Sequence, residues 1–165
     1  MSILKIARMG HPVLSHPASP VKDSDSEYVS RLIVDMIETM NDVSGAGLAA
    51  PQVHVPLRVV IFHVPVEEGT DDLSSSIPLT VLINPKIEIL DSGFEYGMEA
   101  CLSVPGLIGE VPRARVIRYS GINLDGEIIK REAEGFHARV VQHECDHLDG
   151  VLYPMRMKDL STLSF

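Results

Sequence analysis

The sequence predicts one compact domain in which two helices, one near each end of the chain, flank several short and mostly antiparallel strands. Its 165 residues include 45% hydrophobic and 22% charged side chains, a composition typical of a globular domain. Apolar residues recur at helical spacing over residues 25–41 and 136–148, and β-branched and aromatic runs lie between these segments. We therefore expect a single domain over residues 1–165.

The first helix is expected over residues 25–41. Ser24 and Glu27 are spaced as a capping box at its start. Its apolar side chains recur on one face, at Val29, Leu32, Ile33, Met36, Ile37 and Met40. The run that follows contains Gly45 and Gly47 and predicts a loop, because glycine adopts backbone conformations closed to other residues and permits close backbone approach.

Short strands are expected in the middle of the chain. The β-branched and aromatic runs lie at residues 57–64, 80–84 and 86–90, with another pair at 116–119 and 127–134 around a turn-rich segment. The polar, acidic stretch 67–76 has no periodicity and predicts a surface loop. The last residues, 155–165, are expected to form no more than a turn of helix or a loose tail.

Charge and hydropathy exclude several classes of protein. The formal net charge of −9 opposes binding to phosphate backbones, so we expect no nucleic-acid partner. No segment approaches the roughly 20 apolar residues of a membrane-spanning helix, and Lys5 and Arg8 interrupt any signal-peptide core. We expect a cytoplasmic protein without a membrane partner. Cys101 and Cys145 could form a disulfide, but a reducing compartment makes a metal-ligand or core role at least as favourable.

The second expected helix, residues 136–148, contains the motif H-E-x-x-H. Because His143 and His147 are four residues apart, they project from the same face, and both imidazoles can reach one metal ion. Glu144 lies about 100° round the helix from His143, near enough to act on a bound water without being a ligand. The simpler alternative is a chance pair of histidines on an amphipathic helix.

A hydrolytic metal site needs a third protein ligand and one open position for water. After His147 the sequence has no further histidine or glutamate. Cys101 is the better candidate, because a thiolate is a strong ligand for a borderline divalent ion. Cys145 points about 200° away from His143 round the helix and is expected to be a small buried hydrophobe.

Three segments of the chain resemble, in order, the three motifs of the peptide deformylase family. They are residues 45–52 (GAGLAAPQ), 99–103 (EACLS) and 143–147 (HECDH). The resemblance implies an α+β fold, in which short, mostly antiparallel strands pack around a central metal-binding helix, with an amphipathic helix near the N-terminus. It also implies a divalent metal, typically Fe2+, although the residues alone suit Zn2+, Ni2+ or Co2+ as well.

The resemblance further implies a reaction and the residues that perform it. The reaction is removal of the formyl group from the N-terminal methionine of nascent peptides, at or near the ribosome. The implied metal ligands are Cys101, His143 and His147. Glu144 is implied as general acid and base, and Gln52 with the backbone N–H of Leu102 as donors to the developing oxyanion. The implied substrate-binding residues are Gly45, Ala46, Gly47, Glu99 and Ala100.

The sequence departs from the family pattern at two positions. Ala100 stands where the second motif usually has glycine, and Ile108 stands where we expect an arginine. Two alternatives stay open: another metallopeptidase built on the same H-E-x-x-H, and a deformylase-like binding module that has lost turnover through Ala100 and Ile108. Asp146 is expected either to support the site through a pairing with Arg113 or Arg115, or to form an ordinary surface ion pair.

Overall fold

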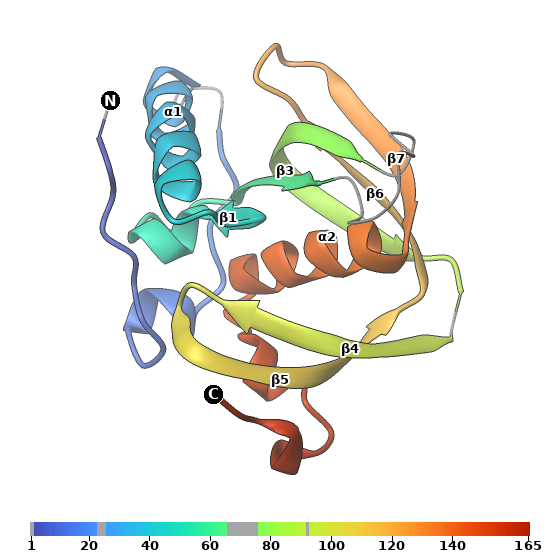
Figure 1. Ribbon diagram of the computed structural model, residues 1–165. Coiled ribbons are helices and arrows are strands. Elements are labelled where there is room, and N and C mark those ends of the chain that lie inside the picture. Colours follow the sequence, from blue (N-terminus) through green and yellow to red (C-terminus); the bar gives the residue numbers. More distant parts are fainter. Residues whose placement is uncertain (1, 23–25, 66–75, 92) are drawn as a thin grey trace.

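In the described part of the chain, two α-helices, one near each end, enclose a run of seven strands, as Figure 1 shows. The computed structural model describes residues 2–22, 26–65, 76–91 and 93–165. Its main elements are α1 (Ser26–Asp42), β1 (Gly47–Ala49), β2 (Val59–Val64), β3 (Ile77–Ile89), β4 (Phe94–Cys101), β5 (Val104–Ala114), β6 (Val116–Ile122), β7 (Ile128–Glu134) and α2 (Gly135–Leu148). Short 3-10 turns are η1 (Pro12–Leu14), η3 (Ala50–Val53), η5 (Tyr153–Met155) and η6 (Leu160–Thr162).

The strands form two separate sheets. One has five strands in the order β1-β2-β3-β6-β7, and the other is a two-stranded ribbon of β4 and β5. Every pair of named strands is antiparallel. The expected α+β class with mostly antiparallel strands is thus confirmed.

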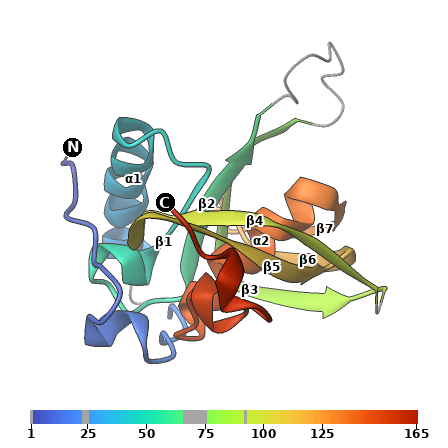
Figure 2. The ribbon, with the colours of Figure 1, turned by 60° about the horizontal axis from the view of Figure 1, so that its bottom comes forward.

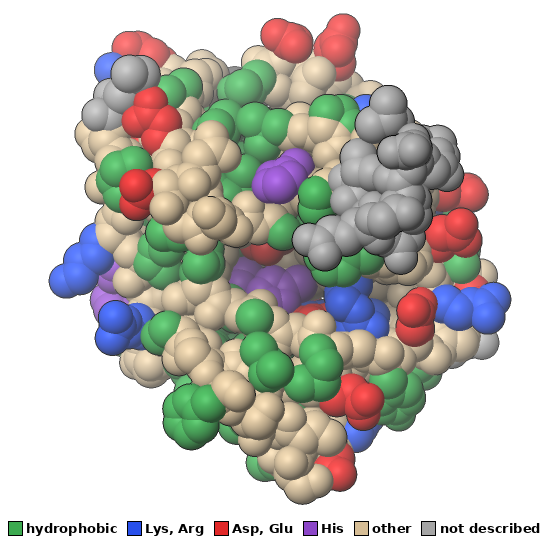
Figure 3. All heavy atoms as spheres, in the orientation of Figure 1, with side chains coloured by type: hydrophobic (Ala, Val, Ile, Leu, Met, Phe, Trp, Pro, Cys, Tyr) green, Lys and Arg blue, Asp and Glu red, His purple; other side chains and the backbone are tan. Residues whose placement is uncertain are grey.

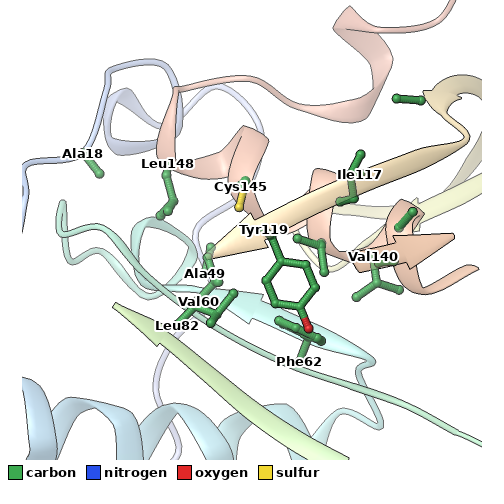
Figure 4. Close-up of a cluster of buried hydrophobic side chains, with 14 residues drawn as sticks. Ala18, Ala49, Val60, Phe62, Leu82, Ile117, Tyr119, Val140, Cys145 and Leu148 are labelled. Atoms are coloured by element: carbon green, nitrogen blue, oxygen red, sulfur yellow. The ribbon is translucent and has the colours of Figure 1, made fainter. Parts of the chain in front are cut away.

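The five-stranded sheet is covered by a helix on each face. Residues of β2 alternate between two cores, because Val59 and Ile61 pack with α1 whereas Val60 and Phe62 pack with α2. A strand buried on both faces needs apolar side chains at successive positions, which explains the uninterrupted run in β2. Figure 4 shows the core on the α2 side, where Tyr119 and Phe62 lie beside Val140.

Helix α2 lies between the five-stranded sheet and the β4–β5 ribbon (Figures 1 and 2). Its side chains therefore face protein on opposite sides, and Cys145 is buried in the core that Figure 4 shows, as expected for a small hydrophobe. A third cluster joins the ribbon to the C-terminal segment through Val111, Leu152 and Tyr153. This arrangement places the end of β4 beside the motif helix.

Several expected boundaries differ from the structure. Helix α1 agrees closely with the expected 25–41, but Ser24 of the capping box and residues 66–75 of the acidic stretch lie outside the described residues. The two strands expected at 80–84 and 86–90 are one strand, β3, in which Asn84 has φ of 52° and the pairing register shifts between Ile83 and Lys86. A local irregularity bends the strand without ending it.

Strands β1, β4 and β5 have no counterpart in the sequence prediction. The two ribbon strands contain Gly97, Pro105, Gly106, Gly109 and Pro112, and residues of these types lower strand propensity. The C-terminal segment forms the turn η6, and Ser164 exchanges two backbone hydrogen bonds of 2.9 Å with Ile108 of β5. Among the described helices, none has the length and apolar character that crossing a bilayer requires.

Candidate metal centre

Helix α2 presents the two motif histidines toward the end of β4. It begins at Gly135, whose φ is 55°, and is followed by Gly150, whose φ is 73°. His143 and His147 lie one turn apart, with ring centroids separated by 5.0 Å. Both rings face the ribbon side of the helix, where β4 ends at Cys101.

Cys101, His143 and His147 form one cluster of candidate ligand atoms. One atom from each residue lies within 4.8 Å of the other two, and the Cys101 Sγ is 3.4 Å from the His147 Nε2. All three residues are buried or nearly so. The structure therefore brings together the three side chains expected to bind a metal, although they come from segments 42 or more residues apart in sequence.

The protonation chemistry of the histidines fits a divalent cation. Burial lowers the pKa of His147 well below its ordinary value, so its ring is neutral and its nitrogen lone pair is available. Burial also acts to lower the pKa of His143, but hydrogen bonds with Cys101 and Glu99 raise it to about 10. A metal ion must displace that proton, so metal binding is coupled to proton release.

Glu99 orients His143 within the cluster. The Nδ1 of His143 donates to the Glu99 Oε2 at 2.8 Å, which leaves Nε2 directed at the cluster. Arg113 donates to both oxygens of Glu99 at 2.8 and 2.9 Å, and Arg139 donates to Oε1 at 2.9 Å. Burial alone would raise the pKa of Glu99, but the hydrogen bonds from Arg113 and His143 outweigh it and lower this pKa to about 2.

Asp146 extends this charged network on the far side of Arg113. The sequence left Arg113 and Arg115 as possible partners, and the structure assigns Asp146 to Arg113. Arg115 instead pairs with Asp91 at 3.0 Å. Arg156 also binds Asp146, through hydrogen bonds of 2.7 and 3.1 Å. Arg139 and Arg156 were missed in the sequence, because no local spacing connects them to the motif.

Glu144 lies beside the cluster and is buried. Burial raises the pKa of its carboxyl to about 7, well above the ordinary value. Its Oε2 has no hydrogen-bond partner among the described residues. Gly47 of the first motif packs against this carboxyl, since a Cβ built on Gly47 would come within 2.6 Å of the Glu144 Cδ. A side chain at residue 47 would therefore displace the Glu144 carboxyl from its observed position.

Gln52 is held so that its amide faces the candidate metal ligand. Its Oε1 accepts a hydrogen bond from the Ala49 N–H at 2.8 Å, which fixes the amide orientation. Its Nε2 donates to the Ser103 Oγ at 3.2 Å and to the Cys101 Sγ at 3.6 Å. Leu102, the other expected oxyanion donor, follows Cys101 and lines a cavity together with Gln52 and Cys101.

An open cavity of about 700 Å³ lies over the cluster. Figure 3 shows it as a central hollow with histidine side chains inside it. All five residues expected to bind substrate line this cavity: Gly45, Ala46, Gly47, Glu99 and Ala100. The backbone of the first motif is held by His63, whose N–H groups donate to the carbonyls of Gly45 and Ala46 at 3.1 and 2.9 Å.

Comparison with known proteins gives the family. The model of the family described as polypeptide deformylase matches residues 3–162. The chain belongs to this family. Deformylase membership makes it a metal-dependent enzyme that removes the N-terminal formyl group from nascent polypeptides. The match spans all three segments that carried the resemblance in the sequence.

Curated relatives and solved structures agree with this assignment. The chain is 52% identical to peptide deformylase 1 of Bordetella pertussis, over 97% of this chain and 90% of the relative. It is 51% identical to peptide deformylase 2 of Ralstonia nicotianae, over 99% and 92%. A class I type b peptide deformylase from Acinetobacter baumannii is similar in structure, with a TM-score of 0.86 and 34% identity over 95% of this chain and 100% of that one. The deformylase of Thermotoga maritima has a TM-score of 0.83 and 38% identity, over 96% and 100%.

Proposed function

We propose that Cys101, His143 and His147 hold one divalent metal, and that Glu144 is the general acid and base of deformylation. The observation that carries this proposal is the cluster of three ligand atoms within 4.8 Å, with an unpaired, buried Glu144 oxygen beside it. We also infer that residues 1–165 act as one catalytic domain, because the proposed site draws on β4, α2 and the segment after α1.

A divalent ion in such a site makes water a nucleophile near neutral pH and polarises a carbonyl oxygen. Glu144 accepts the proton of the attacking water at Oε2, and its raised pKa of about 7 suits proton transfer near neutral pH. The Gln52 Nε2 and the backbone N–H of Leu102 donate to the formyl oxygen as negative charge develops on it. Glu144 then protonates the departing amine, the C–N bond breaks, and formate and a free N-terminus result.

The substrate backbone is proposed to lie between the first and second motifs. Gly45, Ala46 and Gly47 line one side of the cavity, and Glu99 and Ala100 line the other. The Glu99 carboxylate is already bound by Arg113, Arg139 and His143, so we assign its contact with substrate to the backbone and its side chain to orienting His143. An Acinetobacter baumannii deformylase is known with Met-Ala-Ser bound, which supports a short peptide as occupant.

Fe2+ is the metal we propose, because it is the metal that the family resemblance implies. Two imidazoles and a thiolate suit Fe2+, Zn2+, Ni2+ and Co2+, and availability in the cell governs which of them occupies such a site. Because new polypeptides carry the formyl group as they leave the ribosome, we place the enzyme in the cytoplasm, in transient contact with ribosome-bound chains. A thiolate beside Fe2+ is exposed to oxygen chemistry, so purification in air should lower the activity.

Anaerobic purification with metal analysis and a peptide assay on one sample tests this proposal. The expected result is about one metal per chain, predominantly iron, and release of formate from formyl-Met-Ala. Trimming of unformylated peptides without formate release would support the metallopeptidase alternative. A metal-loaded protein that binds formyl-Met-Ala without turnover would support the binding-module alternative, attributed to Ala100 and Ile108.

A further inference from the structure

The two faces of the β4–β5 ribbon differ in what they contact. Glu99, Arg113 and Val111 point inward, toward α2 and the buried network. Because side chains alternate along a strand, the even-numbered partners point the other way. We call this set the outward face, and its paired positions are Tyr96 with Pro112, Met98 with Glu110, and Ala100 with Ile108. The pair of Phe94 and Ala114 is not part of it, because Ala114 is buried in the core on the α2 side.

The outward face is apolar although it is open to solvent. Tyr96 is 56% exposed, Met98 51% and Ile108 38%. An antiparallel sheet with one solvated face normally places polar side chains there, so a row of large apolar residues marks an interaction surface. Figure 3 shows hydrophobic side chains gathered just below the central hollow, over the ribbon.

The outward face is continuous with the catalytic cavity. Met98, Ala100 and Ile108 belong to the outward face and also line the cavity. From there the row continues along β4 to Tyr96, away from Cys101. The occupant of the cavity is a peptide, and whatever part of that peptide extends past Ala100 meets this apolar row first.

We propose that the outward face binds the downstream part of the substrate polypeptide and selects apolar side chains there. This inference rests on the proposed function and adds a specificity surface outside the cavity. A strand rises about 3.3 Å per residue, so Tyr96 lies about 16 Å along β4 from Cys101. An extended substrate reaches Tyr96 only with about its fifth or sixth residue, and a tripeptide does not.

The ribbon is held rigidly, which favours binding without an ordering cost. Arg139 donates to the backbone carbonyls of Glu95 and Val111 at 2.8 Å, and its guanidinium lies so close to Gly97 that a Cβ there would be 2.9 Å from its Cζ. At the other strand, Ser164 pairs with Ile108. The outward face is therefore fixed from the helix side and from the C-terminal segment.

Charge adds a second element of selection. Glu110 is the one acidic side chain among the six outward positions, all of which lie in the described part of the chain. It sits opposite Met98, on the same face. Together with the net charge of −9, this carboxylate disfavours acidic downstream residues.

Matched peptides of two lengths test the proposal. The short substrate is formyl-Met-Ala-Ser, and the long pair is formyl-Met-Ala-Ser-Ala-Leu-Leu and formyl-Met-Ala-Ser-Ala-Ser-Ser. Because alternate side chains of a strand face opposite ways, one of two adjacent leucines always meets the surface. We expect kcat/KM to be about fivefold higher for the Leu-Leu peptide than for the Ser-Ser peptide. An open surface covers about half of a leucine side chain, and the apolar area removed from water accounts for a factor of this size.

Variants at Tyr96 locate the effect. Tyr96→Thr should abolish the preference for Leu-Leu while leaving kcat/KM for the tripeptide within twofold of the parent, and Tyr96→Phe should retain the preference. Ile128→Thr is the matched control, since Ile128 is 81% exposed on β7, away from the ribbon. That variant should behave as the parent does.

Three outcomes would overturn the proposal. The first is equal kcat/KM for the two hexapeptides, and the second is a preference that persists in Tyr96→Thr. The third is self-association through the ribbon, seen by sedimentation and lost in Tyr96→Thr, which would assign the face to a second copy of the chain. A parent that releases no formate even from the tripeptide would instead contradict the proposed function itself.

Discussion

Gly47 is the residue at which the first motif meets the catalytic helix. A Cβ at this position would overlap the Glu144 carboxyl, whereas a Cβ at Gly45 would meet Leu102 and Met40 side-chain atoms at 3.3 and 3.4 Å, which can shift. We expect Gly47→Ala to lower kcat/KM for formyl-Met-Ala about 100-fold, because a displacement on the order of 1 Å in a catalytic group has an effect of that size. Gly45→Ala should lower it much less.

Steady-state kinetics with metal analysis on both variants checks this prediction. Metal content should equal that of the parent in each variant. The nearest side-chain atoms that the added methyl group would meet belong to Glu144, or to Leu102 and Met40, and not to a proposed ligand. Equal losses for Gly45→Ala and Gly47→Ala would show that loop flexibility, and not the position of Glu144, is what the glycines provide.

The buried carboxylate of Glu99 makes the stability of the folded protein depend on pH in acid. Its pKa is about 2 in the folded protein, against an ordinary value of 4.5. A lowered carboxyl pKa contributes stability that is present above about pH 4.5 and lost as pH falls through 2. At 1.36 kcal/mol per pH unit, the contribution is about 3 kcal/mol. Glu99→Gln should remove this part of the pH dependence.

Urea unfolding of the metal-free protein between pH 2 and 4.5 measures the effect. The free energy of unfolding should fall less steeply with acidification in Glu99→Gln than in the parent. Glu88→Gln serves as the control, because Glu88 forms an exposed pair with Arg118 on β3 and β6 and such pairs contribute little. Parallel slopes for the parent and Glu99→Gln would contradict the assigned network.

Single site residues could be predicted where a local motif or the chemistry of a metal ligand pointed to them. Cys101 was predicted as a ligand because a thiolate satisfies the need for a third one, and the H-E-x-x-H spacing predicted His143 and His147 as the other two. The side-chain role of Glu99 could not be found this way, because its partners Arg113 and Arg139 lie 14 and 40 positions away and are joined to it only by folding.

At the scale of elements, the end of α2 depends on Gly150. Its φ is 73°, and a Cβ would lie 2.8 Å from backbone atoms of Ser15 and His16. Gly126 has a similar φ of 79° but open space around it. The left-handed conformation alone disfavours alanine by about 1 kcal/mol. We expect Gly150→Ala to lower the free energy of unfolding by about 3 kcal/mol, because the backbone clash adds to this term.

Chemical denaturation of the two alanine variants separates these terms. Gly126→Ala should lose only about 1 kcal/mol, so the difference between the variants reports the packing of the chain after α2 against the segment near η1. If both variants lose the same amount, the close contact at Gly150 contributes nothing, and the helix end is held only by its backbone conformation.

Periodicity predicted the helices better than the ribbon strands. The face of α1 and the span of α2 follow from 3.6-residue spacing, and both agree with the structure within about two residues. Strands β4 and β5 carry glycine, proline and charge because they bind a network on one face and border the cavity on the other. Their residues serve the network and the cavity and do not alternate as in a usual strand, so the sequence alone did not predict these two strands.

At the scale of the whole molecule, the layers bring the proposed catalytic groups together. The five-stranded sheet supports one side of α2 and the ribbon covers the other, so the end of β4 delivers Cys101 to the histidines of the helix. The first motif approaches from β1, which pairs with β2 at the edge of the large sheet. The class of fold could be predicted from the sequence, but this division into sheet and ribbon depends on pairings between distant segments.

The central claim is that three residues hold the metal while Glu144 performs proton transfer. Metal content and formate release, measured side by side in the parent, His147→Ala and Glu144→Gln, test it most directly. We expect about one metal per chain in the parent, loss of both metal and activity in His147→Ala, and full metal with a 10²–10⁴-fold lower kcat in Glu144→Gln, the usual contribution of a positioned acid and base. Metal retained by His147→Ala as tightly as by the parent, or near-normal turnover in Glu144→Gln, would contradict the account.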